Sequence, residues 1–317
     1  AKTVYEGKPG DMYIAAGHDH TPGYERDFVN RTIAFYNDEL YLRGADGSLA
    51  KVDAPNSAQK GVHKDWLLLE LRDPYTAGGK TYGPGSLIAA HFDAFMAGKR
   101  EFSVLFEPTD TSSLAGYTWT KDHLVLNVME DVKNRLSVLT PGKDGWAKAA
   151  FVGAPPIGTV GVDAVDADDS NAVWLTATDF LTPTTLAIAG LGQQPEVLKT
   201  NPSFFDGAMH VMEQHFATSK DGTRVPYFLV RPKELAFDGK APTLLYGYGG
   251  NFADPASVNN TNDGILNWAD LTTTEGDLAP NASVSVDVWF TAVKDSGGPT
   301  INRAEASGVI PDPDGPG

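Results

Sequence analysis

The stretch EQHFATSKDGTRVPYFLVRPKELAFDGKAPTLLYGYGGNF, residues 213–252, decides the fold. Phe216–Thr218 is short and extended, and Lys220–Gly222 has turn chemistry, because Asp bonds its own backbone and Gly allows positive φ. Val225–Val230 is an apolar, β-rich run. Thr243–Tyr248 reads as a second buried strand that ends in two glycines. Short apolar strands stopped by glycines predict a sheet with one edge facing a loop.

The residues before this stretch also read as short strands. Runs that start near Leu67, Leu124 and Val173 are spaced by roughly 50 residues, a period typical of propeller blades. Each run is followed by further apolar segments, and Asp46-Gly47 separates two such segments as a hairpin turn does. We count about four blade-like units, the first being partial. The expected strands are Thr32–Tyr36, Leu40–Arg43, Leu49–Val52, Leu87–Ala90, Phe102–Phe106, Leu124–Val128, Arg135–Leu139, Trp146–Phe151, Val173–Thr176, Thr184–Ile188 and Glu196–Lys199.

Helix signals are weak. Phe92–Lys99 predicts two turns, and Asp206–His215 predicts two or three. After Ala253 the composition changes to Asn, Asp, Thr, Pro and Gly, with Val284–Thr291 as one expected strand and residues 307–317 as an expected disordered tail.

Composition bounds the functional classes. A net charge of −16 argues against nucleic acid and anionic membranes, since both require a basic face. No apolar run is long enough to span a bilayer, and no signal peptide is visible in a sequence that begins at Ala1, as a mature form or a fragment would. With no cysteine, disulfides, thiolate nucleophiles and Cys-ligated metals are excluded. We expect a soluble protein, cytoplasmic or periplasmic, without a cofactor.

Several phrases together resemble the prolyl oligopeptidase family of serine peptidases. They are PGYERDFVNRTIAFYNDELYLRG (22–44), HKDWLLLELRDP (63–74), LVLNVMEDVKNRLSVLTP (124–141), SKDGTRVPYFLVRPK (219–233) and PTLLYGYGG (242–250). The resemblance covers about residues 1–250, and the family's GGF is here Gly250-Asn251-Phe252. It implies a β-propeller followed by an α/β-hydrolase domain. The expected domains are blades at 1–205, the start of the hydrolase domain at 206–252 and an irregular, partly disordered tail at 253–317.

The resemblance assigns the oxyanion-hole tyrosine of that family to Tyr248. The family's triad needs a serine on a strand-to-helix elbow, followed by an aspartate and a histidine. The sequence has no G-x-S-x-G, and its last histidine is His215, ahead of Tyr248. We therefore expect a truncated relative of serine hydrolase ancestry that lacks the triad, and we interpret Tyr248 as a structural tyrosine.

Two other constellations could carry chemistry. Ser296 in DSGGP and His91 in AAH resemble phrases of chymotrypsin-like proteases, with Asp131 as a carboxylate, but loop and blade readings explain them as well. His18 and His20 have the i, i+2 spacing that places two imidazoles on one face of a strand, where zinc or copper could bind with Glu25 or Asp27 nearby. A solvated polar loop is the competing interpretation.

An acidic run, four tryptophans and a basic cluster can each be interpreted as structural or as functional. The acidic run Asp163–Asp169 suggests calcium but lacks the loop glycine and terminal glutamate, so we interpret it as a turn. The tryptophans are expected in blade cores rather than on a ligand platform; they are Trp66, Trp119, Trp146 and Trp174. Arg224, Arg231 and Lys233 are expected to pair with acidic neighbours, with substrate-carboxylate binding as the alternative.

Three functions stay open from sequence alone. The chain is a prolyl-oligopeptidase-like hydrolase acting on peptides or small esters, a non-catalytic propeller binding module, or a metal-dependent hydrolase at His18 and His20. An incomplete propeller leaves unpaired blade edges. Three solutions stay open: four blades close the ring, the strand expected at Val284–Thr291 covers an edge, or the chain forms a homo-oligomer through its open edges.

Overall fold

The computed structural model describes residues 3–143, 145–219, 222–237, 241 and 244. Contacts divide the chain into two units, 1–233 and 234–317, and the described elements lie in the first. The expected strand at Val284–Thr291 and the expected tail therefore fall outside the described residues, as does the expected strand at Thr243–Tyr248 apart from Leu244. The limits of the expected domains stay a prediction.

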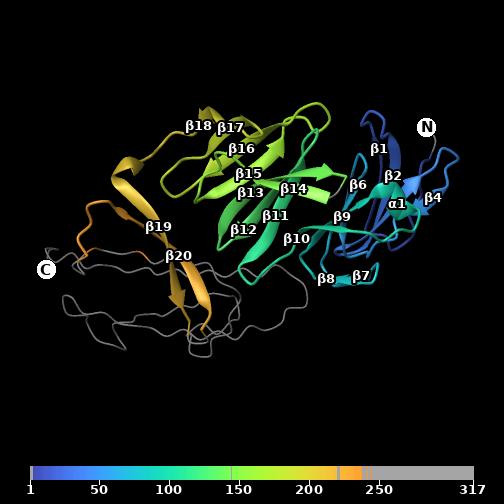
Figure 1. The fold of residues 1–317 in the computed structure, drawn as a ribbon, viewed down its shortest axis with the longest axis horizontal. Helices are drawn as coiled ribbons and strands as arrows, with labels where there is room; N and C mark the ends of the chain where they lie inside the picture. The colour runs from blue at the N-terminus through green and yellow to red at the C-terminus, as the bar shows by residue number, and fades with distance from the viewer. Residues whose placement is uncertain (1–2, 144, 220–221, 238–240, 242–243, 245–317) are drawn as a thin grey trace, which may run out of the picture. The chain divides into compact units, whose positions relative to one another are not determined.

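The described residues form four four-stranded antiparallel sheets, one after another along the chain (Figure 1). We call them blades 1 to 4. Blade 1 contains β1 (Tyr13–Asp19), β2 (Arg26–Ala34), β3 (Asn37–Arg43) and β4 (Leu49–Lys51). Blade 2 contains β5 (Gln59–His63), β6 (Trp66–Glu70), β9 (Leu87–His91) and β10 (Ser103–Phe106).

Blade 3 contains β11 (Ser112–Trp119), β12 (Leu124–Glu130), β13 (Lys133–Gly142) and β14 (Gly145–Ala150). Blade 4 contains β15 (Thr159–Ala164), β16 (Ala172–Thr178), β17 (Thr185–Gly190) and β18 (Glu196–Thr200). In each blade the strands pair with their neighbours in chain order, which is the meander typical of propellers. The predicted mostly-β, partial propeller of about four blades is confirmed.

Smaller elements complete the described part. A hairpin of β7 (Tyr75–Ala77) and β8 (Lys80–Tyr82) interrupts blade 2, and α1 (Phe92–Met96) follows β9, shorter than the helix expected there. A second hairpin joins β19 (His210–Thr218) to β20 (Arg224–Pro232). No helix among the described residues has the length and hydropathy needed to cross a membrane.

The helix expected at Asp206–His215 is wrong. Gly207–Met209 forms a single 3-10 turn, capped by the Asp206 side chain, which accepts a hydrogen bond from the Ala208 N–H at 2.9 Å. From His210 the chain is strand, because its backbone pairs along the whole length of β20. The long-range pairing with β20 therefore overrides the weak local helix preference of this segment.

The core consists of three clusters, each between consecutive blades. Phe28 and Leu40 of blade 1 pack on Leu67 and Leu69 of blade 2. The second cluster joins blades 2 and 3 through Leu68, Leu87, Ala89, Leu105, Phe106, Leu124, Leu126 and Leu139. The third joins blades 3 and 4 through Val125, Leu136, Phe151, Val160, Val173, Leu175, Ala187 and Ala189. Along the central strands β6 and β12, successive side chains point alternately toward the preceding and the following blade, so both faces of these strands are buried.

Candidate functional site

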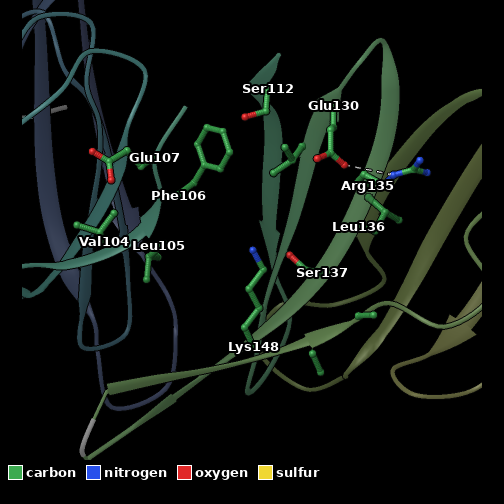
Figure 2. A pocket seen from close by; sticks show the side chains of 13 residues that line it. Val104, Leu105, Phe106, Glu107, Ser112, Glu130, Arg135, Leu136, Ser137 and Lys148 are labelled. Atoms are coloured by element: carbon green, nitrogen blue, oxygen red, sulfur yellow. Dashed lines mark ion pairs between the residues drawn. The ribbon is translucent and has the colours of Figure 1, made fainter. Parts of the chain in front are cut away.

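A cavity of about 630 Å³ lies between the end of β10 and the face of blade 3 that is turned toward blade 2. We call it the blade 2/3 cleft. In Figure 2, Val104, Phe106 and Glu107 line one side, and Glu130, Arg135 and Ser137 line the other. Its remaining lining residues are Leu105, Ser112, Val128, Leu136, Lys148, Ala149 and Ala150. Its volume is within the range of sites that hold small ligands.

The strand register explains why this cleft is polar at one end. Leu124, Leu126, Val128 and Glu130 share one face of β12, because side chains alternate along a strand. The first three of these residues belong to the apolar interface with blade 2, whereas Glu130 comes at the end of the strand. Arg135 lies opposite Val128 on β13, so charged groups collect where the two blades stop packing.

The charges in the blade 2/3 cleft are mixed. Glu130 Oε2 lies 3.6 Å from Arg135 Nε, and both side chains are about half exposed. Lys148 adds a cation from β14 and Glu107 adds an anion after β10 (Figure 2). None of the described residues that line the cleft is a histidine. The arrangement suits binding of a ligand with both charges and an apolar part.

At the other end of the same interface lies a row of aromatic rings. His91 stacks on Trp66 at 4.2 Å, and Trp66 contacts Trp146 edge-on at 4.7 Å. Trp146 lies 5.8 Å from Trp119, which stacks on His63 at 4.8 Å, all distances being between ring centroids. The three tryptophans pack against the buried leucines of the interface. The prediction that they form blade core is confirmed for these three.

The predicted His91, Asp131 and Ser296 constellation gains no support from the described residues. His91 is an exposed residue at the end of β9 whose ring stacks on Trp66. Asp131 lies in the turn between β12 and β13, and its backbone carbonyl accepts a hydrogen bond from the Gln214 side chain. Ser296 and Tyr248 both lie outside the described residues, so their catalytic assignments stay predictions.

The His18 and His20 rings lie close together, but only His18 belongs to β1, because the strand ends at Asp19. His18 Nδ1 lies 2.7 Å from Asp27 Oδ1 on β2. This hydrogen bond is the main reason that the pKa of Asp27 is lowered. The His20 ring lies 4.4 Å from the His18 ring. Among the described residues, no three His, Asp or Glu side chains form a metal-holding group.

The remaining candidates have structural partners. The Asp166 carboxylate accepts hydrogen bonds from the backbone N–H groups of Asp168 and Asp169, which lower its pKa and close a turn. Arg231 Nη2 lies 2.7 Å from Glu213 Oε1, and the Arg224 guanidinium lies 3.7 Å from the centroid of the Phe216 ring. The part of the acidic run from Asp166 to Asp169 is thus a turn, as expected, whereas Asp163 belongs to β15. Arg231 pairs with an acidic neighbour, also as expected.

Comparisons with known proteins place the chain. No protein-family model matches it. An uncharacterized peptidase of Sinorhizobium fredii is 34% identical over 261 residues, which are 79% of this chain and 36% of that protein. A prolyl oligopeptidase of Omphalotus olearius is 25% identical over 243 residues, covering 67% of this chain and 30% of its own length. The chain therefore spans about a third of the length of these relatives.

Among solved structures, a post-proline cleaving enzyme from Rickettsia typhi superimposes with a TM-score of 0.63 and 25% identity, over 76% of this chain and 36% of that enzyme. Propeller blades and peptidase relatives together define the class: a β-propeller protein of peptidase ancestry. Within that class, the chain belongs to the prolyl oligopeptidase family.

Sequence reasoning missed the blade 2/3 cleft. A signal was present, since Glu130 and Arg135 interrupt the apolar alternation of two otherwise buried strands. That the two residues face a cavity follows only from the β12–β13 register and from the position of β10 across the gap.

Proposed function

We propose that this chain is the propeller part of a prolyl-oligopeptidase-like serine peptidase, and that it binds peptides without hydrolysing them. The observation that carries the proposal is that the chain has the blades of a peptidase family, while its described residues contain no hydroxyl, imidazole and carboxylate arranged as a triad. Triad chemistry requires all three groups in one hydrogen-bonded series.

The described hydrogen bonds supply only separate pieces of such a series. His123 Nδ1 lies 2.8 Å from Thr140 Oγ1, which is an imidazole–hydroxyl pair in blade 3. His18 and Asp27 are an imidazole–carboxylate pair in blade 1. The two pairs are on different blades, and neither contains the third group. The absence of a histidine after His215 in the sequence adds to the argument against the family's own triad.

Peptide binding is assigned to the blade 2/3 cleft. A peptide presents a positive amino group, a negative carboxylate and apolar side chains. Lys148 and Glu107 offer the complementary charges, and the wall formed by Val104 and Phe106 offers apolar surface. Pockets that combine an apolar lining with a few charged groups orient ligands in this way.

The first test is hydrolysis by the purified chain. Gly-Pro-p-nitroanilide and a p-nitrophenyl ester are assayed with and without a fluorophosphonate, and with and without EDTA. We expect no turnover above a heat-denatured control. Turnover abolished by the fluorophosphonate would overturn the non-catalytic part of the proposal, and mapping of the labelled peptide would then examine Ser296. Turnover abolished by EDTA would favour the metal-dependent hydrolase at His18 and His20.

The second test is binding of a short proline-containing peptide, measured by fluorescence anisotropy. Lys148→Ala should weaken binding by up to roughly fivefold, because exposed ion pairs contribute about 0.2–1 kcal/mol. Lys199→Ala, an exposed lysine on β18, is the matched control and should leave binding unchanged. Equal binding by both variants and the parent chain would remove the cleft from the proposal.

A second candidate function is retained serine hydrolase activity, and similarity to a peptidase of Sinorhizobium fredii and a prolyl oligopeptidase of Omphalotus olearius favours it. The fluorophosphonate assay separates the two candidates. Homo-oligomer formation through blade edges stays a further proposal, to be checked by the sedimentation of the chain at several concentrations.

A further inference from the structure

The geometry points to a divalent transition-metal site at the end of β1, where His18 and His20 supply two imidazole ligands. We propose that the ion is of the kind that prefers imidazole, such as Cu²⁺, Ni²⁺ or Zn²⁺. The site is independent of the peptide-binding proposal, because it lies in blade 1 and uses none of the residues of the blade 2/3 cleft.

The ring positions carry the first step. The centroids of the His18 and His20 rings are 4.4 Å apart, with an interplanar angle of 71°. Metal–imidazole bonds are about 2.0–2.1 Å long, so two imidazoles bound at near-right angles to one ion have centroids roughly 4.5 Å apart. The separation of the two rings in the chain is therefore close to that of two imidazoles bound at near-right angles to one ion.

The partner of His18 carries the second step. Asp27 Oδ1 lies 2.7 Å from His18 Nδ1, and the two residues face each other directly in the β1–β2 register. A carboxylate that accepts a hydrogen bond from Nδ1–H fixes the tautomer with a free Nε2 lone pair. His18 is thus held as a ligand that binds through Nε2. Its side chain is 45% exposed, so an ion can reach it from solvent.

The backbone around His20 is also fixed. Asp19 Oδ1 accepts a hydrogen bond from the Thr21 N–H at 2.9 Å, and the Tyr24 N–H donates to the Thr21 carbonyl at 2.9 Å. Thr21 itself is buried. These contacts hold the turn that directly follows β1, so His20 stays beside His18 instead of moving with a free loop. A backbone that is already ordered at His20 lowers the entropic cost of chelation.

The rest of the coordination sphere comes from solvent. Because the described residues hold no third His, Asp or Glu in a metal-holding group, the described part of the site offers two protein ligands. Asp19 lies between the two histidines in the sequence, Asp27 lies opposite His18 in the β1–β2 register, and Glu25 lies two residues before Asp27. The whole chain carries a net charge of −16. Both features favour a cation at this position over an anion.

The test uses the full chain, freed of any histidine tag, titrated with Cu²⁺ in a non-coordinating buffer. Calorimetry gives the affinity, and electron paramagnetic resonance counts the nitrogen ligands. We expect one ion with the hyperfine pattern of two imidazole nitrogens. His20→Ala should lower the affinity by at least tenfold, and Asp27→Asn by roughly tenfold, the lower end of what is typical for a lost carboxylate–histidine bond.

Matched controls keep the result interpretable. His215→Ala removes another exposed histidine that pairs with a carboxylate, Glu213 at 3.4 Å, and should leave Cu²⁺ affinity unchanged. His20 lies outside the β1 strand, so His20→Ala should retain the far-ultraviolet circular dichroism of the parent chain. Unchanged affinity in His20→Ala and in His18→Gln, or a signal from a single nitrogen, would overturn the proposal.

Discussion

All four blades have the same strand topology, but two of their faces are stabilised by different interactions. The face of blade 1 turned away from blade 2 carries a row of ion pairs: Arg31 lies 2.7 Å from Asp11 and 2.8 Å from Glu39, and Lys51 lies 2.8 Å from Glu39. The interface between blades 2 and 3 is a layer of fully buried leucines, closed at one end by the aromatic row.

The difference shows which contacts hold the blades together. Burial of apolar area is the dominant favourable term in folding, at about 25 cal/mol per Å². Ion pairs near the surface typically contribute about 0–1 kcal/mol, because water competes for the charges. We therefore infer that the blade 2/3 interface stabilises the described unit, whereas the blade 1 face mainly makes its stability depend on pH.

The largest effect is expected from Leu126→Ala. Leu126 is fully buried between blades 2 and 3, and its truncation should lower the free energy of unfolding by about 2–5 kcal/mol through lost burial and a residual cavity. Urea unfolding followed by tryptophan fluorescence measures it. Leu49→Ala on β4, where the side chain is 38% exposed, is the matched control and should cost far less. Equal losses would contradict the assignment of stability to the interface.

The next effect tests a polar exception inside the buried interfaces. Between blades 3 and 4, the Asn134 amide donates to Asn127 Oδ1 at 2.7 Å and its Oδ1 accepts from the Val160 N–H at 3.0 Å. The Asn127 amide donates in turn to the Val160 carbonyl at 2.7 Å, which closes the network onto one residue of β15. Both asparagines are buried. Hydrogen bonds of two asparagines thus attach β15 to blade 3, whereas leucines fill the interface between blades 2 and 3.

Asn134→Ala should cost about 1–3 kcal/mol in the free energy of unfolding, because it leaves a buried acceptor and a buried N–H without partners. The same urea experiment measures the loss, with exposed Asn201→Ala as the control. A loss within error of the control would mean that water replaces the missing amide. The asparagine network would then not be needed to stabilise the interface between blades 3 and 4.

The sequence predicted the second, third and fourth strands of most blades but missed the first. The missed strands are β1, β5, β11 and β15. Each contains a glycine and several polar or small residues, for example QKGVH in β5 and YIAAGHD in β1. Such composition lowers β propensity, and the strands form because β2, β6, β12 and β16 offer a complete backbone edge. Pairing of this kind is a tertiary effect that a local pattern does not contain.

The site was less predictable than the fold. The i, i+2 spacing suggested that His18 and His20 lie close together, and their rings do, although His20 lies just beyond the end of β1. The role of Asp27 needed the β1–β2 register, which places it opposite His18 from nine residues away. Similarly, nothing local indicates that Glu107 and Lys148 border one cavity, because they come from different blades.

The smallest effect belongs to the ion-pair row of blade 1, and pH reveals it. Hydrogen bonds from Lys51, then from Tyr41 and Arg31, lower the pKa of Glu39 to about 2. In the unfolded chain the same carboxyl titrates near its ordinary value of 4.5. A carboxyl with a depressed folded-state pKa stabilises the fold above the unfolded value, and this contribution is lost as the pH falls from about 4.5 toward 2.

Glu39→Gln should therefore be less stable than the parent chain at pH 6, and the difference should shrink as the pH is lowered to 2.5. Urea midpoints measured across this range give the comparison, with exposed Glu196→Gln on β18 as the control. A difference between parent and Glu39→Gln that stays constant with pH would show that Glu39 acts through packing, as the leucines of the blade 2/3 interface do.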